Sequence, residues 1–292
     1  MDRDFEAATG RPVILDIVQP SPQSLPVVLA SPHSGRDYPA EFLASARLDS
    51  HALRKSEDCF VDEIAHPAAQ IGAPLLKALF PRAFLDPNRE AFELDPAMFA
   101  DTLPAYVNTR SPRVAAGLGT IARVVANGQD IYRSKLRFAE ALDRITHYYH
   151  PYHAALKRLV DETGARFGTC LLIDCHSMPS TGGPSERDAG RPRQDFVLGD
   201  CHGNACAARV TDTAERVLRD LGYSVGRNSP YAGGFTTRHY GRPRLGVHAL
   251  QVEINRGLYM DEARYTRKPY LPTLARHMAT LVESLGSLSL AP

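Results

Sequence analysis

Short apolar runs that lead into polar residues are the most regular feature of this chain. One run covers residues 27–31 and leads into SPHSGRDYP, a second covers 170–173 and leads into DCHSMP, and a third covers 247–254 with Glu253 inside it. Apolar runs of this length that end at Pro or Gly are typical of buried strands. Weaker runs predict four further strands, the first of them at a sheet edge: residues 13–18, 73–80, 196–198 and 223–225.

Segments with apolar residues at helical spacing alternate with these strands. They predict four helices: residues 50–66, 134–149, 204–221 and 261–285. Pro67 is expected to end the first helix, and Pro151 either kinks the second or begins another helix in its first turn. Strands that alternate with helices are typical of a parallel or mixed sheet flanked by helices. We therefore predict an α/β fold with a central mixed sheet, formed as a single domain by residues 1–292.

The charge and composition of the chain narrow its partners. The formal net charge of the 292 residues is +1 at pH 7, so no strong field attracts nucleic acid or an anionic membrane. No apolar stretch approaches the roughly 20 residues that span a bilayer, and the N-terminal sequence MDRDFEAATG is unlike a secretory signal. Five cysteines without CxxC spacing predict reduced thiols. These features favour a cytoplasmic protein that binds neither nucleic acid nor membrane, and no pattern specifies an oligomeric state.

Histidines stand at the ends of two of the predicted strands. Ligands of α/β folds bind beyond the carboxyl ends of strands, which is where His33 and His176 lie. A catalytic zinc ion takes three protein ligands and keeps one position open for water. Glu57 and Asp58, on the helix predicted after the first strand, are both candidates for the third ligand. A second candidate metal-binding group has histidines at three-residue spacing: His147, His150 and His153. Steps of three residues turn side chains apart on a helix, which favours surface or supporting roles for these histidines.

Charged residues near the same strand ends are candidates for catalysis. Glu253 lies in an apolar strand, where a buried carboxylate needs a partner. That partner is either a metal-bound water, which would make Glu253 a general base, or Arg256 in an ion pair. The pair Asn88-Arg89 follows another strand, and a guanidinium can bind a carboxylate through two hydrogen bonds. Arg82 lies seven residues before Arg89 and is expected to point into the same cleft.

Seven segments, in chain order, resemble those of the N-formylglutamate amidohydrolase family: SPHSGRDYP, DCFVDEI, PRAFLDPNRE, IDCHSMP, DFVLGD, GGFTTRHYG and QVEINRGLYMD. They extend from Ser31 to Asp261, which is most of the chain. The resemblance implies a phosphorylase/hydrolase-like α/β fold, related to the zinc carboxypeptidases and to aspartoacylase. It also implies hydrolysis of N-formyl-L-glutamate to formate and L-glutamate, a step in histidine breakdown. Two histidines and a carboxylate would bind zinc or another divalent transition metal for this reaction.

The resemblance also implies a metal-ligand set. His33 and His176 correspond to two histidine ligands, and Asp58 occupies the family's acidic position, so it is preferred to Glu57 as the third. The wider fold often uses an HxxE pair, but Arg36 stands three residues after His33 in this chain. The third ligand is therefore expected on the helix that follows.

The remaining roles follow from the same resemblance. Asn88-Arg89 is similar to the Asn-Arg pair that binds a substrate carboxylate in the related peptidases, and Glu253 is similar to their general base. Arg82 is our candidate for stabilising the oxyanion. Further candidates for binding a small anionic substrate are Thr237, Arg238 and Arg256. Two alternatives stay open: an aspartoacylase-like or desuccinylase-like deacylase of another N-acyl amino acid, and a non-catalytic binder of acidic metabolites.

Overall fold

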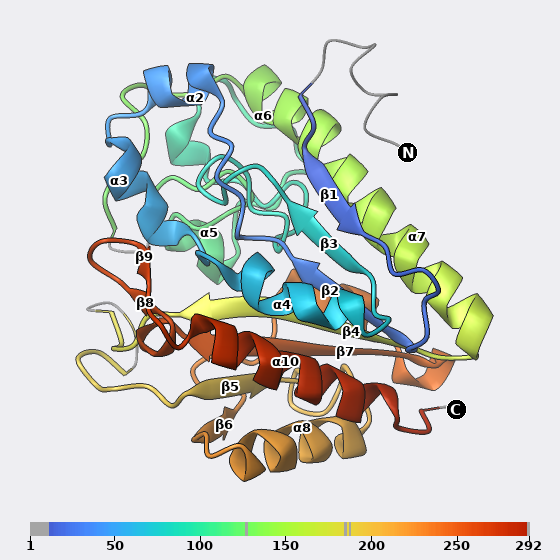
Figure 1. Cartoon of the computed structure of the whole chain (residues 1–292). Helices are drawn as coiled ribbons and strands as arrows, with labels where there is room; N and C mark the ends of the chain where they lie inside the picture. The colour runs from blue at the N-terminus through green and yellow to red at the C-terminus, as the bar shows by residue number, and fades with distance from the viewer. Residues whose placement is uncertain (1–11, 126–127, 184–185, 187, 291–292) are drawn as a thin grey trace.

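A seven-stranded sheet forms the centre of the computed structural model, which describes residues 12–125, 128–183, 186 and 188–290 (Figure 1). In spatial order the strands are β1 (Leu15–Val18), β3 (Leu75–Ala78), β2 (Val27–Ser31), β4 (Cys170–Met178), β7 (Val247–Asn255), β5 (Phe196–Gly199) and β6 (Val225–Arg227). Strands β3, β2, β4 and β7 run parallel, whereas β1 pairs antiparallel with β3, and β5 pairs antiparallel with β7 and parallel with β6. The prediction of an α/β fold with a central mixed sheet is confirmed, and β1 is the edge strand that was expected.

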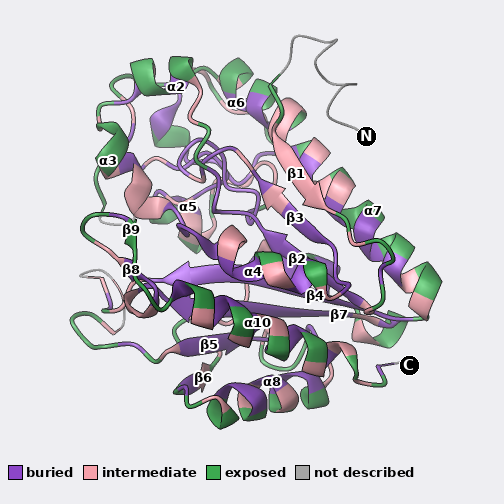
Figure 2. Ribbon diagram, in the orientation of Figure 1, coloured by how far each residue is buried: buried purple, intermediate pink, exposed green. Residues whose placement is uncertain are grey.

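Alternating side chains on the central strands supply two apolar layers. Val27 and Leu29 pack on one face with helices α4 (Val61–Gln70), α8 (Ala208–Asp220) and α10 (Leu271–Gly286). Val28 and Ala30 pack on the other face with α7 (His150–Phe167). The central strands and the inward helix faces are buried, the edge strand β1 is partly exposed, and the outward helix faces are exposed (Figure 2). Because both faces of the sheet are covered, the open position for a ligand is at the ends of the strands.

The helix expected over residues 50–66 is broken, which corrects the prediction. Helix α3 (Ser50–Leu53) passes into a 3-10 turn, η2 (Arg54–Ser56), and α4 begins only at Val61 after Phe60, whose φ is 65°. Asp58 lies in this break, where its backbone N–H donates to the carbonyl oxygen of His33 at 3.0 Å. A continuous helix would satisfy that N–H internally, so the contact with the end of β2 replaces a helical turn. Pro67 lies inside α4 rather than at its end.

Other predicted boundaries also shift. The helix expected at residues 134–149 consists of α6 (Phe138–Arg144) and a π-helical turn, η4 (Ile145–Tyr149), and Pro151 then lies in the first turn of α7. The glycine-rich segment at residues 228–241, for which no helix was predicted, contains α9 (Phe235–Tyr240). The last helix begins at Leu271, with Pro272 in its first turn, and β8 (Met260–Asp261) and β9 (Thr266–Arg267) precede it as a small sheet. The remaining short elements are α2 (Ala40–Ser45), η3 (Pro96–Met98), α5 (Pro112–Ala115), η5 (Pro243–Leu245) and η6 (Arg256–Leu258).

The structure bears on two expectations, the absence of a membrane span and the reduced state of the cysteines. Across the part of the chain that the structure describes, no helix is long and apolar enough to cross a membrane. The five cysteines all lie in that part and are free of disulfide bonds. The organisation of residues 1–292 as one domain stays a prediction.

Gly35 controls the approach of the His33 turn to the end of β3. A Cβ atom at Gly35 would lie 2.2 Å from the carbonyl oxygen of Phe80 and 2.5 Å from the carbonyl carbon of Leu79. We expect Gly35→Ala to lower the free energy of unfolding by roughly 1–3 kcal/mol, because backbone must move to admit the methyl group. Urea denaturation measures the change.

Gly164, inside α7, is the matched control. A Cβ atom there would have no neighbour within 4 Å. Gly164→Ala should raise the free energy of unfolding by roughly 0.5–1 kcal/mol, since alanine favours a helix interior over glycine. Equal stabilities of the two alanine variants would contradict this account of the His33 turn.

Candidate active site

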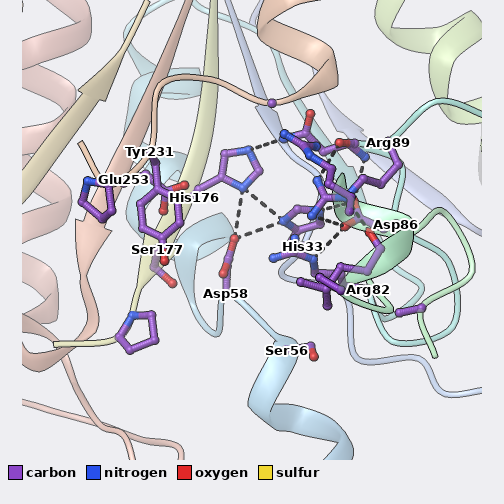
Figure 3. Close-up of a pocket in the computed structure, with 18 of the residues that line it drawn as sticks. His33, Ser56, Asp58, Arg82, Asp86, Arg89, His176, Ser177, Tyr231 and Glu253 are labelled. Atoms are coloured by element: carbon purple, nitrogen blue, oxygen red, sulfur yellow. Dashed lines mark hydrogen bonds and ion pairs between the residues drawn. The ribbon is translucent and has the colours of Figure 1, made fainter. Parts of the chain in front are cut away.

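Three side chains converge at the carboxyl ends of the parallel strands. His33 follows β2, Asp58 lies in the break before α4, and His176 lies on β4. The Nδ1 atoms of the two histidines are 3.1 Å apart, and Asp58 Oδ2 lies 3.2 Å from His33 Nδ1 and 3.1 Å from His176 Nδ1. All three residues are buried, and their contacts form the centre of Figure 3. We call this group the His33–Asp58–His176 triangle.

The triangle has the donor types and the spacing of a transition-metal site. In a tetrahedral zinc site with bonds of about 2.0–2.1 Å, ligand atoms lie about 3.3 Å from one another. The three distances in the triangle are close to this value. Within the described residues, these are the ligands that lie close enough together to hold a metal ion as a group of three. The second candidate metal-binding group is not assembled, since His153 instead faces Tyr240 and the carbonyl oxygen of Pro87.

Carboxylates face the outer nitrogens of both histidine rings. His33 Nε2 lies 2.8 Å from Asp86 Oδ1. His176 Nε2 lies 3.0 Å from Asp174 Oδ1, an ion-pair distance at which Oδ1 nevertheless accepts no aligned hydrogen bond. Carboxylates behind metal-binding histidines fix the ring orientation and increase its basicity as a ligand. This arrangement directs both Nδ1 atoms toward Asp58.

Charged neighbours stabilise the ionised form of the buried carboxylates. Burial disfavours the Asp58 carboxylate, but His176, His33 and Arg256 outweigh it and hold its pKa well below the usual range. Arg256 Nη2 donates to Asp58 Oδ1 at 2.9 Å, which leaves Oδ2 to the triangle. The ion-pair partner of Arg256 is therefore Asp58 rather than Glu253. Asp86 likewise has a strongly lowered pKa despite burial, because two arginines and His33 surround it.

Glu253 has the properties of a carboxylate that exchanges protons near neutral pH. It lies on β7 directly opposite His176 in the strand register, and its Oε1 accepts a hydrogen bond from Gln251 Nε2 at 2.9 Å. Burial raises the pKa of Glu253 to about 7. Figure 3 shows Glu253 on one side of the triangle and Arg82, Asp86 and Arg89 on the other. A general base is most effective when its pKa is near the working pH.

The triangle opens into a cavity of about 470 Å³, a size suited to a small ligand. Its charged lining, apart from the two histidines, comprises five cationic side chains and four carboxylates: Lys55, Arg82, Arg89, Arg113, Arg256, Asp58, Asp86, Glu186 and Glu253. The cationic side chains are suited to an anionic ligand, and the carboxylates and histidines are suited to a metal ion that the ligand would contact.

Comparison with known proteins identifies the family. Residues 25–260 match the model of the family described as N-formylglutamate amidohydrolase. The chain belongs to this family. The N-formylglutamate deformylases of Pseudomonas putida and Pseudomonas aeruginosa are 27% and 29% identical to it over 241 residues, which are 82% of this chain and 83% of each relative. The resemblance inferred from the seven sequence segments is thus confirmed.

Solved structures agree with this assignment. The crystal structure of N-formylglutamate amidohydrolase from Ralstonia eutropha JMP134 superposes with a TM-score of 0.86 at 37% identity, covering 94% of this chain and 98% of that one. The gene product Atu2144 of Agrobacterium tumefaciens shares the fold, with a TM-score of 0.65 at 18% identity over 94% of this chain and 96% of that one.

Eight of the ten predicted site residues of this amidohydrolase-family chain line the one cavity: His33, Asp58, Arg82, Asn88, Arg89, His176, Glu253 and Arg256. Thr237 and Arg238 do not line it, since Thr237 is buried within α9 and Arg238 is exposed. Glu57 is directed elsewhere and accepts hydrogen bonds from Tyr38 and Arg54.

Asn88 lines the cavity, but the protein itself engages both ends of its side-chain amide. Its Oδ1 accepts from Thr236 N at 2.8 Å, and its Nδ2 donates to Asp174 Oδ2 at 3.2 Å. The same Nδ2 lies 3.0 Å from His176 Nε2. These contacts favour a role for Asn88 in holding α9 against the carboxylate behind His176.

Sequence reasoning missed four residues of this site. Asp174 and Gln251 each precede a recognised site residue by two positions on a strand, so their side chains share its face, and this spacing was a usable signal. Asp86 lies two residues before Asn88, in a turn without a regular period. Arg113 lies in an irregular stretch, where only the folded chain brings it to the cavity.

Asp86 should affect metal affinity without being a ligand itself. We expect Asp86→Asn to weaken zinc binding roughly 10- to 100-fold, because the amide no longer offers His33 Nε2 a charged acceptor. Competition with a chromophoric chelator measures the affinity.

Asp95 provides a control on the same stretch of chain. It is also a buried carboxylate, paired with Arg123 at 2.8 Å and bonded to Ala97 N, but it does not line the cavity. Asp95→Asn should leave zinc affinity unchanged. Equal affinities in the two variants would argue against a supporting role for Asp86.

Proposed function

We propose that this chain is a metal-dependent deformylase that hydrolyses N-formyl-L-glutamate to formate and L-glutamate. The observation that carries the proposal is the convergence of the His33–Asp58–His176 triangle with Glu253 in one arginine-lined cavity. Relatives named N-formylglutamate deformylase support the choice of substrate. The family is one of amidohydrolases. The proposal adds the identity of the substrate, N-formyl-L-glutamate.

The triangle would hold the metal ion, which in our proposal is zinc. Such an ion would supply Lewis acidity that polarises the scissile carbonyl group and lowers the pKa of water. Asp86 and Asp174 orient the two histidine rings from behind, while Arg256 fixes the carboxylate plane of Asp58. These contacts hold the ligand atoms in place before the ion binds, so little reorganisation accompanies binding.

Glu253 carries the proton transfers in this proposal. It accepts a proton from the attacking water as oxygen bonds to the formyl carbon, and it returns that proton to the amide nitrogen as the C–N bond breaks. The products are formate and the free amine of glutamate. Its position opposite His176 on a neighbouring strand and its pKa of about 7 support both steps.

Two arginines have separate proposed roles. Arg82 donates only its Nε to Asp86, so among the described residues its two terminal nitrogens keep donors for a developing oxyanion. Arg89 donates Nε to Leu118 O and Nη1 to Asn88 O, both at 2.9 Å, which fixes the plane of the guanidinium. We assign Arg89 to a substrate carboxylate because a fixed guanidinium orients the ligand at low entropic cost.

Metal content and formate release together test the proposed function. Purified protein should carry one zinc ion per chain and release formate from N-formyl-L-glutamate, and a chelator should abolish the release until zinc is restored. His176→Ala should lose both properties, while His147→Ala, at a partly exposed histidine outside the cavity, should keep both. Formate release that survives in His176→Ala would reject the metal site, and zinc binding without formate release would reject the substrate.

The pH profile tests the role of Glu253. Because only the carboxylate accepts a proton, wild-type kcat/KM should fall as pH drops through the pKa of Glu253, which is about 7 and moves lower beside a bound cation. Glu253→Gln should keep its zinc and lose roughly 10²- to 10⁴-fold in kcat. The acidic limb due to Glu253 should be missing from its residual activity.

Glu283→Gln, at an exposed position on α10, is the charge-matched control and should match the wild type. Near-normal turnover by Glu253→Gln would show that another group is the base.

A further inference from the structure

Arg113 lines the cavity but has no role in the proposed reaction. It lies in α5, whose first turn is capped by Ser111, with Ser111 Oγ accepting a hydrogen bond from Val114 N at 3.0 Å. The side chain of Arg113 lines the cavity. Its Nη1 atom is closed off from solvent and has no hydrogen-bond partner among the described residues.

The other three cavity arginines have protein partners. Arg256 is paired with Asp58 at 2.9 Å and also donates to Ser177 Oγ. Arg82 and Arg89 share Asp86, at 2.9 and 3.5 Å. Arg113 forms no ion pair within the part of the chain that is described, so it is the cavity arginine that the cavity's own carboxylates leave unmatched at contact distance.

An enclosed guanidinium nitrogen without a partner is unfavourable inside a protein. A buried donor that has lost its water must be compensated by an acceptor, and a charged donor requires it most strongly. Burial and the nearby charge of Arg238 both lower the pKa of Arg113. A ligand that brings an anionic oxygen to this position would offset these terms, whereas a neutral ligand would not.

The position of Arg113 suits the far end of such a ligand. In an N-acyl amino acid the α-carboxylate is on the carbon bonded to the amide nitrogen, so it must lie beside the reacting group. Arg89, adjacent to Asp86 and thus to His33, is suited to that carboxylate. Among the described residues, Arg113 forms no hydrogen bond or ion pair with the triangle or with the carboxylates behind it, although the charge of Asp86 reaches it. Arg113 is therefore suited to a carboxylate several bonds farther away.

We propose that Arg113 binds the side-chain carboxylate of the substrate, so that the site selects dicarboxylic N-acyl amino acids over those with a neutral side chain. This inference rests on the proposed deformylase function. It gives the substrate's two carboxylates separate arginines, Arg89 near the reacting amide and Arg113 at the distal end.

Two substrates of nearly equal shape test this assignment. N-formyl-L-glutamine replaces the side-chain carboxylate of N-formyl-L-glutamate with a neutral amide. The zinc-loaded wild type should prefer the glutamate derivative. Arg113→Met should lower kcat/KM for that derivative roughly 10- to 100-fold, mainly by raising KM, and should change kcat/KM for the glutamine derivative little. Arg113→Lys should recover part of the preference.

Arg110→Met is the matched control, because Arg110 is exposed on the same segment and does not line the cavity. It should leave both substrates unaffected. Equal loss on both substrates in Arg113→Met would overturn the proposal, since it would indicate a general structural effect. A wild-type enzyme without preference for the glutamate derivative would overturn it as well.

Binding measurements separate this inference from the proposed reaction. If the wild type hydrolyses neither compound, the deformylase proposal fails, and calorimetry with L-glutamate and L-glutamine then tests Arg113 alone. Zinc-loaded wild type should bind L-glutamate more tightly, and Arg113→Met should lose that difference. A preference that persists in Arg113→Met, or one that is missing from the wild type, would refute the assignment.

Discussion

The close approach of three electron-pair donors, without water between them, is the constraint on which the rest of this structure depends. The two Nδ1 atoms and Asp58 Oδ2 lie within 3.2 Å of one another in a buried setting. Such an arrangement is unfavourable unless a cation or shared protons lie between the donors. Every neighbouring feature serves this requirement, because Asp86 and Asp174 stand behind the rings and Arg256 stands behind the carboxylate.

Carboxylates and cationic side chains alternate with increasing distance from the triangle. His33 meets Asp86, Asp86 meets Arg82 and Arg89, and Asp58 meets Arg256, so Asp86 and Asp58 each lie beside an opposite charge. Networks of this kind add little net stability, because desolvation offsets most of the attraction. Their effect is geometric, since removing one member leaves its partner unsatisfied and thereby disfavours alternative arrangements. Arg113 stands outside this alternation, and its unpaired guanidinium is the basis of the proposed selection of ligands by charge.

The sequence predicts the site residues that lie on strands or at their ends. His33, His176 and Glu253 were recognisable because a buried strand has an apolar run, and parallel strands bring their carboxyl ends to one edge. Asp58 was recognised through the family resemblance but was expected on a helix, because local periodicity across residues 50–66 contains no sign of the hydrogen bond between Asp58 N and His33 O. That bond joins segments 25 residues apart in sequence. Arg113 is the extreme case, as neither periodicity nor a motif relates it to the other cavity residues.

Residues on the strands and residues in irregular segments have different proposed functions in the cavity. The proposed chemical groups lie on strands or next to them, whereas Arg89 and Arg113 belong to a long irregular segment after β3. Its shape depends on specific backbone contacts: Asp86 N donates to Thr120 O at 2.8 Å, and a Cβ atom at Gly119 would lie 2.2 Å from Glu93 O. Loops on a rigid scaffold tolerate change more readily than the strands do. Substitutions at Arg113 are therefore expected to alter which acyl amino acid fits while the metal ligands stay in place, so this fold can vary substrate choice separately from chemistry.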